Sequence, residues 1–186
     1  IDVTKSYIWM IYIHMISIEN IIFKDKKVII RVDFNVPLEK NLKVSDNSRI
    51  KASLPTVKKL ISDGAAIILM SHLGRPDGRE KKFSLKNILP ELEKVFNSKI
   101  SFADDILSPL TDKKVKDLQS GQILLLENLR FYKGEEEGDY AFAQRLASFA
   151  DCYVNDAFGT SHRKHASTTI IAQFFKNQKF SGYLID

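Results

Sequence analysis

Short apolar runs alternate along this chain with longer segments in which apolar residues recur at helical spacing, and this alternation restricts the fold more than any other feature. The short runs are rich in β-branched residues, so each predicts a strand. They are apolar at consecutive positions, which is typical of strands buried on both faces of a parallel sheet. The predicted strands cover residues 27–33, 65–70, 99–102, 122–126, 151–154 and 182–185.

The segments between these runs have the apolar period of amphipathic helices. Ser84 precedes one of them as a predicted N-cap, and Pro90 lies inside it, which predicts a kink or a later start. The predicted helices cover residues 48–62, 85–96, 105–118, 139–149 and 167–176. Repeated alternation of strand and helix predicts the α/β class, here a Rossmann-like doubly wound parallel sheet of about six strands with helices on both faces.

Composition excludes some classes of protein and leaves others open. Apolar residues make up 44% of the chain, enough to form a core, so a disordered chain is excluded. The single cysteine, Cys152, excludes a disulfide scaffold and a cysteine-built zinc site. The formal net charge of +5 favours an anionic partner without choosing among a substrate, a nucleic acid and a membrane surface.

The two ends of the sequence differ from the rest. Residues 8–18 are apolar and aromatic, but a membrane-spanning helix needs about 20 apolar residues, and no signal-peptide cleavage site follows. We therefore expect residues 1–14 to be a non-native or mis-started leader and Met15 to be the natural start. The sequence stops directly after a strand-like run, so we expect a second half of the protein downstream of Asp186.

Polar side chains follow four of the predicted strands, at the edge where ligands bind in open α/β sheets. Asp33, Phe34 and Asn35 follow the first strand, with Arg49 beyond a loop; His72, Leu73, Gly74 and Arg75 follow the second; Arg130 follows the fourth; His162 and Arg163 follow the fifth. The planar guanidinium of arginine pairs bidentately with carboxylate or phosphate. Four arginines and two histidines at one edge therefore predict a site for a small, multiply charged anion, with Asp33 and Asn35 orienting its hydroxyl groups.

Several residues also have a plainer interpretation. Asp33 and Asn35 are common turn formers. We expect His165 and Cys152 to be structural, and the three glutamates at 135–137 to form a solvated loop or the start of a helix. The anion site is favoured because all four arginines follow strands, whereas unrelated surface arginines would be scattered.

The usual nucleotide-binding motifs are absent from the sequence. It contains no G-x-G-x-x-G fingerprint, no G-K-[ST] and no G-x-S-x-G elbow, and its four histidines are too scattered for a recognisable metal site. Two alternatives stay open beside an enzyme domain for a small anion. One is a non-catalytic basic α/β domain that binds anions or nucleic acid, although its arginines follow strands instead of lining a helix. The other is a Rossmann-type enzyme that uses a dinucleotide, against which the missing fingerprint argues.

Four strings, in this order and at this spacing, carry a family resemblance: RVDFNVP at 31–37, SHLGRP at 71–76, ENLRFY at 127–132 and VNDAFGTSHR at 154–163. From about residue 16 to residue 186 the chain resembles the N-terminal domain of phosphoglycerate kinases. The resemblance implies two Rossmann-like domains joined by a helix. It also implies the glycolytic, reversible transfer of a phosphoryl group between ATP and 3-phosphoglycerate, which gives ADP and 1,3-bisphosphoglycerate with Mg²⁺.

The resemblance further implies a substrate site for 3-phosphoglycerate or 1,3-bisphosphoglycerate. Its expected residues are Asp33, Phe34, Asn35, Arg49, His72, Leu73, Gly74, Arg75, Arg130 and Arg163. Asp33 and Asn35 would bind the hydroxyl and carboxylate of the glycerate end, and the histidine with the later arginines would hold carboxylate and phosphate. Arg49 would be the catalytic residue, because it would stabilise the phosphoryl group during its transfer.

The resemblance places the nucleotide elsewhere. In the family, ATP or ADP with Mg²⁺ is held through the C-terminal domain, which this sequence lacks. We therefore expect this segment to bind no cofactor alone and to transfer no phosphoryl group alone. We also expect a cytoplasmic monomer that binds neither nucleic acid nor membranes.

Overall fold

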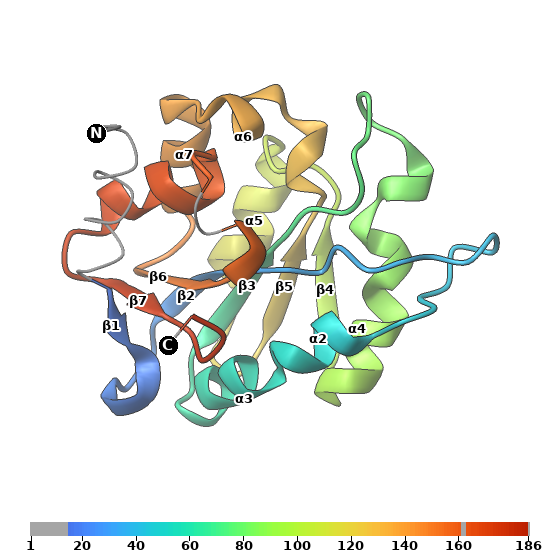
Figure 1. The fold of residues 1–186 in the computed structure, drawn as a ribbon. Coiled ribbons are helices and arrows are strands. Elements are labelled where there is room, and N and C mark those ends of the chain that lie inside the picture. The colour runs from blue at the N-terminus through green and yellow to red at the C-terminus, as the bar shows by residue number, and fades with distance from the viewer. Residues whose placement is uncertain (1–14, 161–162, 186) are drawn as a thin grey trace, which may run out of the picture.

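A seven-stranded parallel sheet forms the centre of the computed structural model, which describes residues 15–160 and 163–185 (Figure 1). The strands lie in the order β1-β7-β6-β2-β3-β5-β4, and every pairing between neighbours is parallel. Their bounds are β1 Ile16–Ser17, β2 Lys27–Val32, β3 Ala66–Met70, β4 Ile100–Ala103, β5 Ile123–Leu126, β6 Cys152–Asp156 and β7 Lys179–Ser181.

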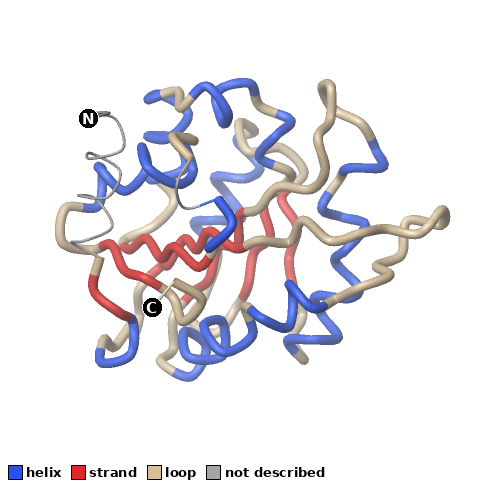
Figure 2. The backbone as a smooth tube through the Cα atoms, in the orientation of Figure 1, coloured by secondary structure: helices blue, strands red, loops and turns tan. Residues whose placement is uncertain are grey.

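Helices cover both faces of this sheet, as the blue segments on either side of the red strands show (Figure 2). The α-helices are α2 Ser48–Ala52, α3 Leu54–Ser62, α4 Leu89–Phe96, α5 Pro109–Asp117, α6 Lys133–Glu137 and α7 Tyr140–Ala147. A π-helical turn, Ala166–Ile170, and a 3-10 helix, Ile171–Phe175, connect β6 with β7. Helices α2, α3 and α4 lie on one side of the sheet, and α5, α6 and α7 lie on the other (Figure 1).

Two hydrophobic cores lie between the sheet and these helix layers. Val28 and Ile30 of β2 point into the core that α3 and α4 close, whereas Ile29 between them points into the core that α5 and α7 close. Each buried strand therefore contributes apolar side chains to both cores. This is why the strands appear in the sequence as continuous apolar runs, and it confirms the predicted doubly wound α/β fold.

The strand predictions hold in number and place except at the two ends. The short strand β1 adds a seventh member, and the prediction of a strand at 182–185 is wrong, because the last strand is β7 and 182–185 form a turn. In that turn the backbone N–H groups of Tyr183 and Leu184 donate to the side chains of Thr56 and Asp156. A Cβ atom at Gly182 would collide with the Asp156 carboxylate, so this glycine permits a close approach and not a strand.

Local chemistry also divides the predicted helices. The expected helix 48–62 breaks at Ser53, whose hydroxyl donates to the carbonyl of Ile50, and α3 restarts there with Pro55 in its first turn. The expected helix 85–96 begins as a 3-10 turn, Leu85–Ile88, capped by Ser84, and α4 starts late so that Pro90 also lies in a first turn. A proline is tolerated there because its missing N–H would have no helical partner.

The three remaining helix predictions are shortened or changed in type. Ser108 caps α5, so that helix begins at Pro109 and not at 105, and Asp139 caps α7 through a 2.6 Å hydrogen bond from the N–H of Phe142. The segment predicted as a helix at 167–176 becomes the π-helical turn and the 3-10 helix. Within the described residues, no helix is long and apolar enough to cross a bilayer.

The strand order makes the carboxyl ends of β2 and β6, which are neighbours in the sheet, the place where this topology favours a binding crevice. The chain leaves β2 toward the face that carries α2 and α3, and it leaves β6 toward the opposite face, where Ala166 and Ile171 pack into the second core. Loops that depart to opposite faces from adjacent strands open a binding crevice between them. The polar residues that follow β2, β3, β5 and β6 all lie at this edge.

Candidate functional site

Hydrogen bonds join the loops that follow β2, β3 and β5 into one structure. Asn35 Oδ1 accepts from the N–H of Gly74 at 2.8 Å, which connects the first loop with the second. Asn128 donates to the carbonyl of Leu73 at 2.8 Å and accepts from its N–H at 3.2 Å, which connects the second with the third. Arg130 then donates through Nη1 to the carbonyl of Gly74 at 2.6 Å. Residues predicted to share a site are therefore in direct contact.

Asp33 and Asn35 are turn formers as well as candidate ligand groups. Asp33 Oδ1 accepts from the N–H of Asn35 at 3.2 Å, while Asp33 Oδ2 forms an ion pair with Arg49. Arg49 is the second residue of α2, and its side chain is 54% exposed. Gly159 lies close by, because a Cβ atom built on it would be 3.4 Å from Asp33 Oδ2. The structure therefore confirms the turn-forming interpretation, and the role of Asp33 and Asn35 toward a ligand stays a prediction.

The segment that follows β3 supplies mostly backbone. Leu73 is buried in the first core, as is Phe34 of the preceding loop, so only their backbone groups can face a ligand. Gly74 has φ +64°, and any side chain on it would collide with the ring of Phe83. Its N–H and carbonyl bind Asn35 and Arg130. This glycine therefore permits the tight turn that brings the two loops together.

Three of the predicted arginines lie close enough to affect one another electrostatically. Burial lowers the pKa of Arg130, and Glu136, 3.2 Å from Arg130 Nε, opposes that shift. The positive charges of Arg163 and Arg75 lower the same pKa further, and so does that of Arg31. Glu136 pairs with Arg130 alone among these like charges, and positive charges gathered in this way favour the binding of an anion.

His72 is a neutral member of this cluster. Its Nδ1 lies 3.1 Å from Arg31 Nη2, and because a guanidinium only donates hydrogen bonds, Nδ1 must accept and Nε2 must carry the hydrogen. Burial lowers the pKa of His72 to about 2, assisted by the charges of Arg31 and Arg130. His72 therefore offers an N–H donor and no charge at neutral pH. His162, the second histidine of the sequence prediction, lies outside the described residues.

The sequence prediction omitted Arg31, which is fully buried inside β2. Its Nε donates to Ser167 Oγ at 3.0 Å, Nη1 donates to the carbonyl of Val32 and Nη2 donates to His72. A charged residue inside an apolar strand is itself a signal, because buried charges need partners. That signal identifies Arg31 as special but does not say which residues meet it.

The prediction of a solvated segment at 135–137 is wrong for its first residue. Glu136 and Glu137 are exposed, but Glu135 is buried, 1% exposed. Its carboxylate accepts from the N–H of Ser167 at 3.0 Å and from Ser167 Oγ at 2.6 Å, and burial raises its pKa. The helix α6 is five residues long, so its inward face could not be recognised from periodicity.

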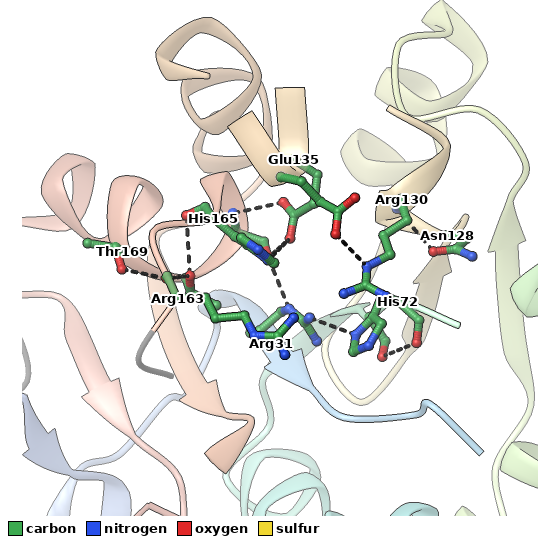
Figure 3. A network of polar contacts seen from close by, with 12 residues as sticks. Arg31, His72, Asn128, Arg130, Glu135, Arg163, His165 and Thr169 are labelled. Atoms are coloured by element: carbon green, nitrogen blue, oxygen red, sulfur yellow. Dashed lines mark hydrogen bonds and ion pairs between the residues drawn. The ribbon is translucent and has the colours of Figure 1, made fainter. Parts of the chain in front are cut away.

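His165 and Cys152, expected to be structural, lie at different places in the fold. His165 Nδ1 is 3.7 Å from Glu135 Oε1, and burial lowers the pKa of His165 to about 4 (Figure 3). Cys152 begins β6, at the opposite edge of the sheet from the cluster, and burial raises the pKa of its thiol to about 11. The part of the chain that the structure describes contains no group of three His, Cys, Asp or Glu side chains that could hold a metal ion.

Comparison with known proteins identifies the family. The family model described as phosphoglycerate kinase matches residues 18–186. The chain belongs to the phosphoglycerate kinase family. The sequence resemblance is thereby confirmed, and the four motifs that carry it all lie inside the matched region.

Individual phosphoglycerate kinases agree with this assignment. The chain is 46% identical to the phosphoglycerate kinase of Porphyromonas gingivalis, over 91% of this chain and 46% of that protein, and 48% identical to the cytosolic one of Nicotiana tabacum, over 91% and 42%. Among solved structures, it superposes on the phosphoglycerate kinase of Coxiella burnetii with a TM-score of 0.80 at 38% identity, covering 92% of this chain and 42% of that one. The enzyme from Pyrococcus horikoshii has a TM-score of 0.82 at 32% identity, with 92% and 43% covered. The chain thus spans just under half the length of these relatives.

Proposed function

We propose that the arginine cluster at the carboxyl edge binds 3-phosphoglycerate and its product 1,3-bisphosphoglycerate in reversible phosphoryl transfer with ATP. The observation that carries this proposal is the gathering of Arg31, Arg130 and Arg163 around neutral His72, with Arg75 close enough to Arg130 to affect its pKa. A compact anion with a carboxylate at one end and a phosphate at the other suits several guanidinium groups that approach from different loops. A cluster around one crevice favours such a molecule over a nucleic acid, which would need an extended basic face.

Residues at different positions of the edge would have different roles in binding and transfer. Asp33 and Asn35 would orient the hydroxyl and carboxylate of the glycerate, since their loop meets Gly74 and Arg49. The clustered arginines would hold the charged ends. Arg49, exposed at the start of α2, would stabilise the charge of the phosphoryl group as it moves, because phosphoryl transfer depends on positioning and charge stabilisation more than on covalent chemistry.

ATP and Mg²⁺ would enter this reaction through a second domain. Longer relatives have room for one, since this chain covers just under half of their length. Mg²⁺, when bound, would supply neutralisation of the charge on the nucleotide phosphates. We assign no residue of this chain to either group, and we expect the chain by itself to bind the acid without transferring a phosphoryl group. We further propose a cytoplasmic, monomeric enzyme.

Calorimetric titration of the 186-residue chain with 3-phosphoglycerate at low salt tests the proposal. The wild-type chain should bind this acid more tightly than glycerate or inorganic phosphate alone. Arg163→Ala should weaken binding by about 10- to 100-fold, since a hydrogen bond to a charged group contributes about 1.5 to 3 kcal/mol. Lys164→Ala is the matched control, because Lys164 is the adjacent and exposed cation and should leave affinity within about twofold. Equal effects of the two substitutions would remove Arg163 from the site.

A further inference from the structure

Glu135 lies beside the arginine cluster, close to His165 and Arg130 (Figure 3). It projects inward from α6, and both of its carboxylate oxygens accept hydrogen bonds from one residue, Ser167. The remaining acidic residues of α6 behave differently: Glu136 pairs with Arg130, and Glu137 is exposed. Among the three glutamates of this helix, Glu135 is therefore the buried one.

A relay of hydrogen bonds connects Glu135 to the cations of the site. Ser167 Oγ donates to Glu135 Oε1 at 2.6 Å, so its lone pairs are left to accept from Arg31 Nε at 3.0 Å. Arg31 in turn donates through Nη2 to His72 Nδ1. The Glu135 carboxylate accepts from Ser167, and the Arg31 guanidinium, which can only donate, determines the direction of the other two hydrogen bonds.

Residues next to Ser167 hold the segment that carries Arg163. The hydroxyls of Thr168 and Thr169, consecutive residues of the π-helical turn, donate to the carbonyl of Arg163 at 2.7 and 2.9 Å. The carbonyl of Lys164 packs against Gly138 so closely that any side chain there would collide with it. Ser167 and these threonines are buried, so the position of the turn depends on what anchors Ser167. π-Helical turns are uncommon and often occur at functional sites.

We propose that Glu135 is a positioning residue for substrate binding, which rests on the function proposed above. By holding Ser167 through two hydrogen bonds, it orients Arg31 and His72 on one side and the backbone of Arg163 on the other. It contacts no substrate atom itself. It thereby positions Arg31 of β2, the neutral His72 that follows β3 and the backbone of Arg163 before the turn, which are distant in the sequence.

Electrostatics alone predicts the opposite effect, which makes the proposal testable. A negative charge behind an anion site repels the anion, so neutralising it should strengthen binding if charge were its whole contribution. Positioning predicts that neutralisation weakens binding, because glutamine presents one oxygen where Ser167 needs two acceptors. The direction of the change therefore separates the two roles.

Two single variants and their combination form the binding test. In the 186-residue chain, Glu135→Gln and Ser167→Ala should each raise the Kd for 3-phosphoglycerate about tenfold, while the control Glu137→Gln, on the same helix, should leave it unchanged or slightly lower. Because both substitutions break one relay, the double variant should bind no more than about threefold worse than the weaker single variant. Urea unfolding measured in parallel shows whether each variant folds. If Glu135→Gln does not fold, the Kd of Ser167→Ala tests the proposal. A folded variant that binds as tightly as the wild type, or more tightly, overturns the proposal.

A ligand-free readout keeps this result distinct from the proposed function. The ¹⁵N–¹H signal of the Arg31 Nε–H should exchange slowly with water in the wild type and at least tenfold faster in Ser167→Ala and Glu135→Gln, but not in Glu137→Gln. If the wild-type chain fails to bind 3-phosphoglycerate, the proposed function fails, and faster exchange still supports the relay. Unchanged exchange in both variants overturns it.

Discussion

Arg31 and Arg49 serve the same edge of the sheet under opposite conditions. Arg49 is about half exposed and pairs with Asp33, whereas Arg31 is fully buried and donates to Ser167, His72 and the backbone. An exposed ion pair contributes little free energy and can exchange partners, while a buried cation is held by a network that is costly to break. The difference suggests that the edge has a fixed base, built around Arg31, and an adaptable rim, to which Arg49 belongs.

The largest expected effect tests that difference directly. Arg31→Met should lower the free energy of unfolding by about 3 to 5 kcal/mol, because it leaves the buried Glu135 without its nearby cation. Arg49→Met should lower it by less than about 1 kcal/mol. Urea denaturation of both variants at pH 7 provides the measurement. Equal losses would show that the base and the rim do not differ in stability.

Asp156 is a second buried carboxylate at this edge, and its contacts differ from those of Glu135. Asp156 Oδ1 accepts from the N–H of Leu184, but Oδ2 has no hydrogen-bond partner among the described residues, and burial raises the pKa of Asp156 to about 6. The unfolded chain ionises this group near its ordinary value of 3.8, so stability is lost as the pH rises through about 6. A shift of about two units corresponds to a cost of about 2 to 3 kcal/mol above that pH.

Asp156→Asn should therefore raise the free energy of unfolding at pH 8 by about 2 kcal/mol, and the gain should vanish by about pH 4. Glu135→Gln should instead destabilise at pH 8, since its carboxylate uses both oxygens. Chemical denaturation at the two pH values compares them. Destabilisation by Asp156→Asn at pH 8 would mean that its charged form is stabilised by contacts other than those described.

The smallest expected effect is the pH dependence of stability that His72, in the fixed part of the edge around Arg31, produces. With a pKa of about 2, His72 stays neutral in the folded state, whereas the unfolded state takes up a proton below about 6.5. Stability is therefore lost as the pH falls below 6.5, by about 1.4 kcal/mol per pH unit for this residue. His165 adds a loss down to about pH 4, and Asp156 opposes both between about pH 6 and 4.

Comparison with a variant isolates the contribution of His72. His72→Asn keeps an acceptor for Arg31 but cannot take up a proton in this range. Between pH 6 and 5 its free energy of unfolding should fall by about 1.4 kcal/mol less than that of the wild type. If the unfolding free energy of the two proteins fell equally with pH, His72 would already be protonated and positively charged in the folded state.

Sequence reasoning succeeded where one residue type has one physical consequence. Continuous apolar runs such as 65–70 had to be buried strands, and motifs after those strands had to meet at one edge, so the meeting of Asn35, Gly74 and Arg130 was foreseeable. It failed where a distant partner changes the outcome. The strand expected at 182–185 is a turn because Thr56 and Asp156 bind its N–H groups.

The chain's apolar pattern and its four motifs were sufficient to determine the α/β fold, the family and the edge that carries the arginines, because strand burial and motif identity are local properties of the sequence. Tertiary structure alone decided that Glu135 is interior, that Arg31 joins the cluster and that one serine connects them. Burial of a charged side chain depends on partners that the fold brings from more than 100 residues away, and no local pattern records them.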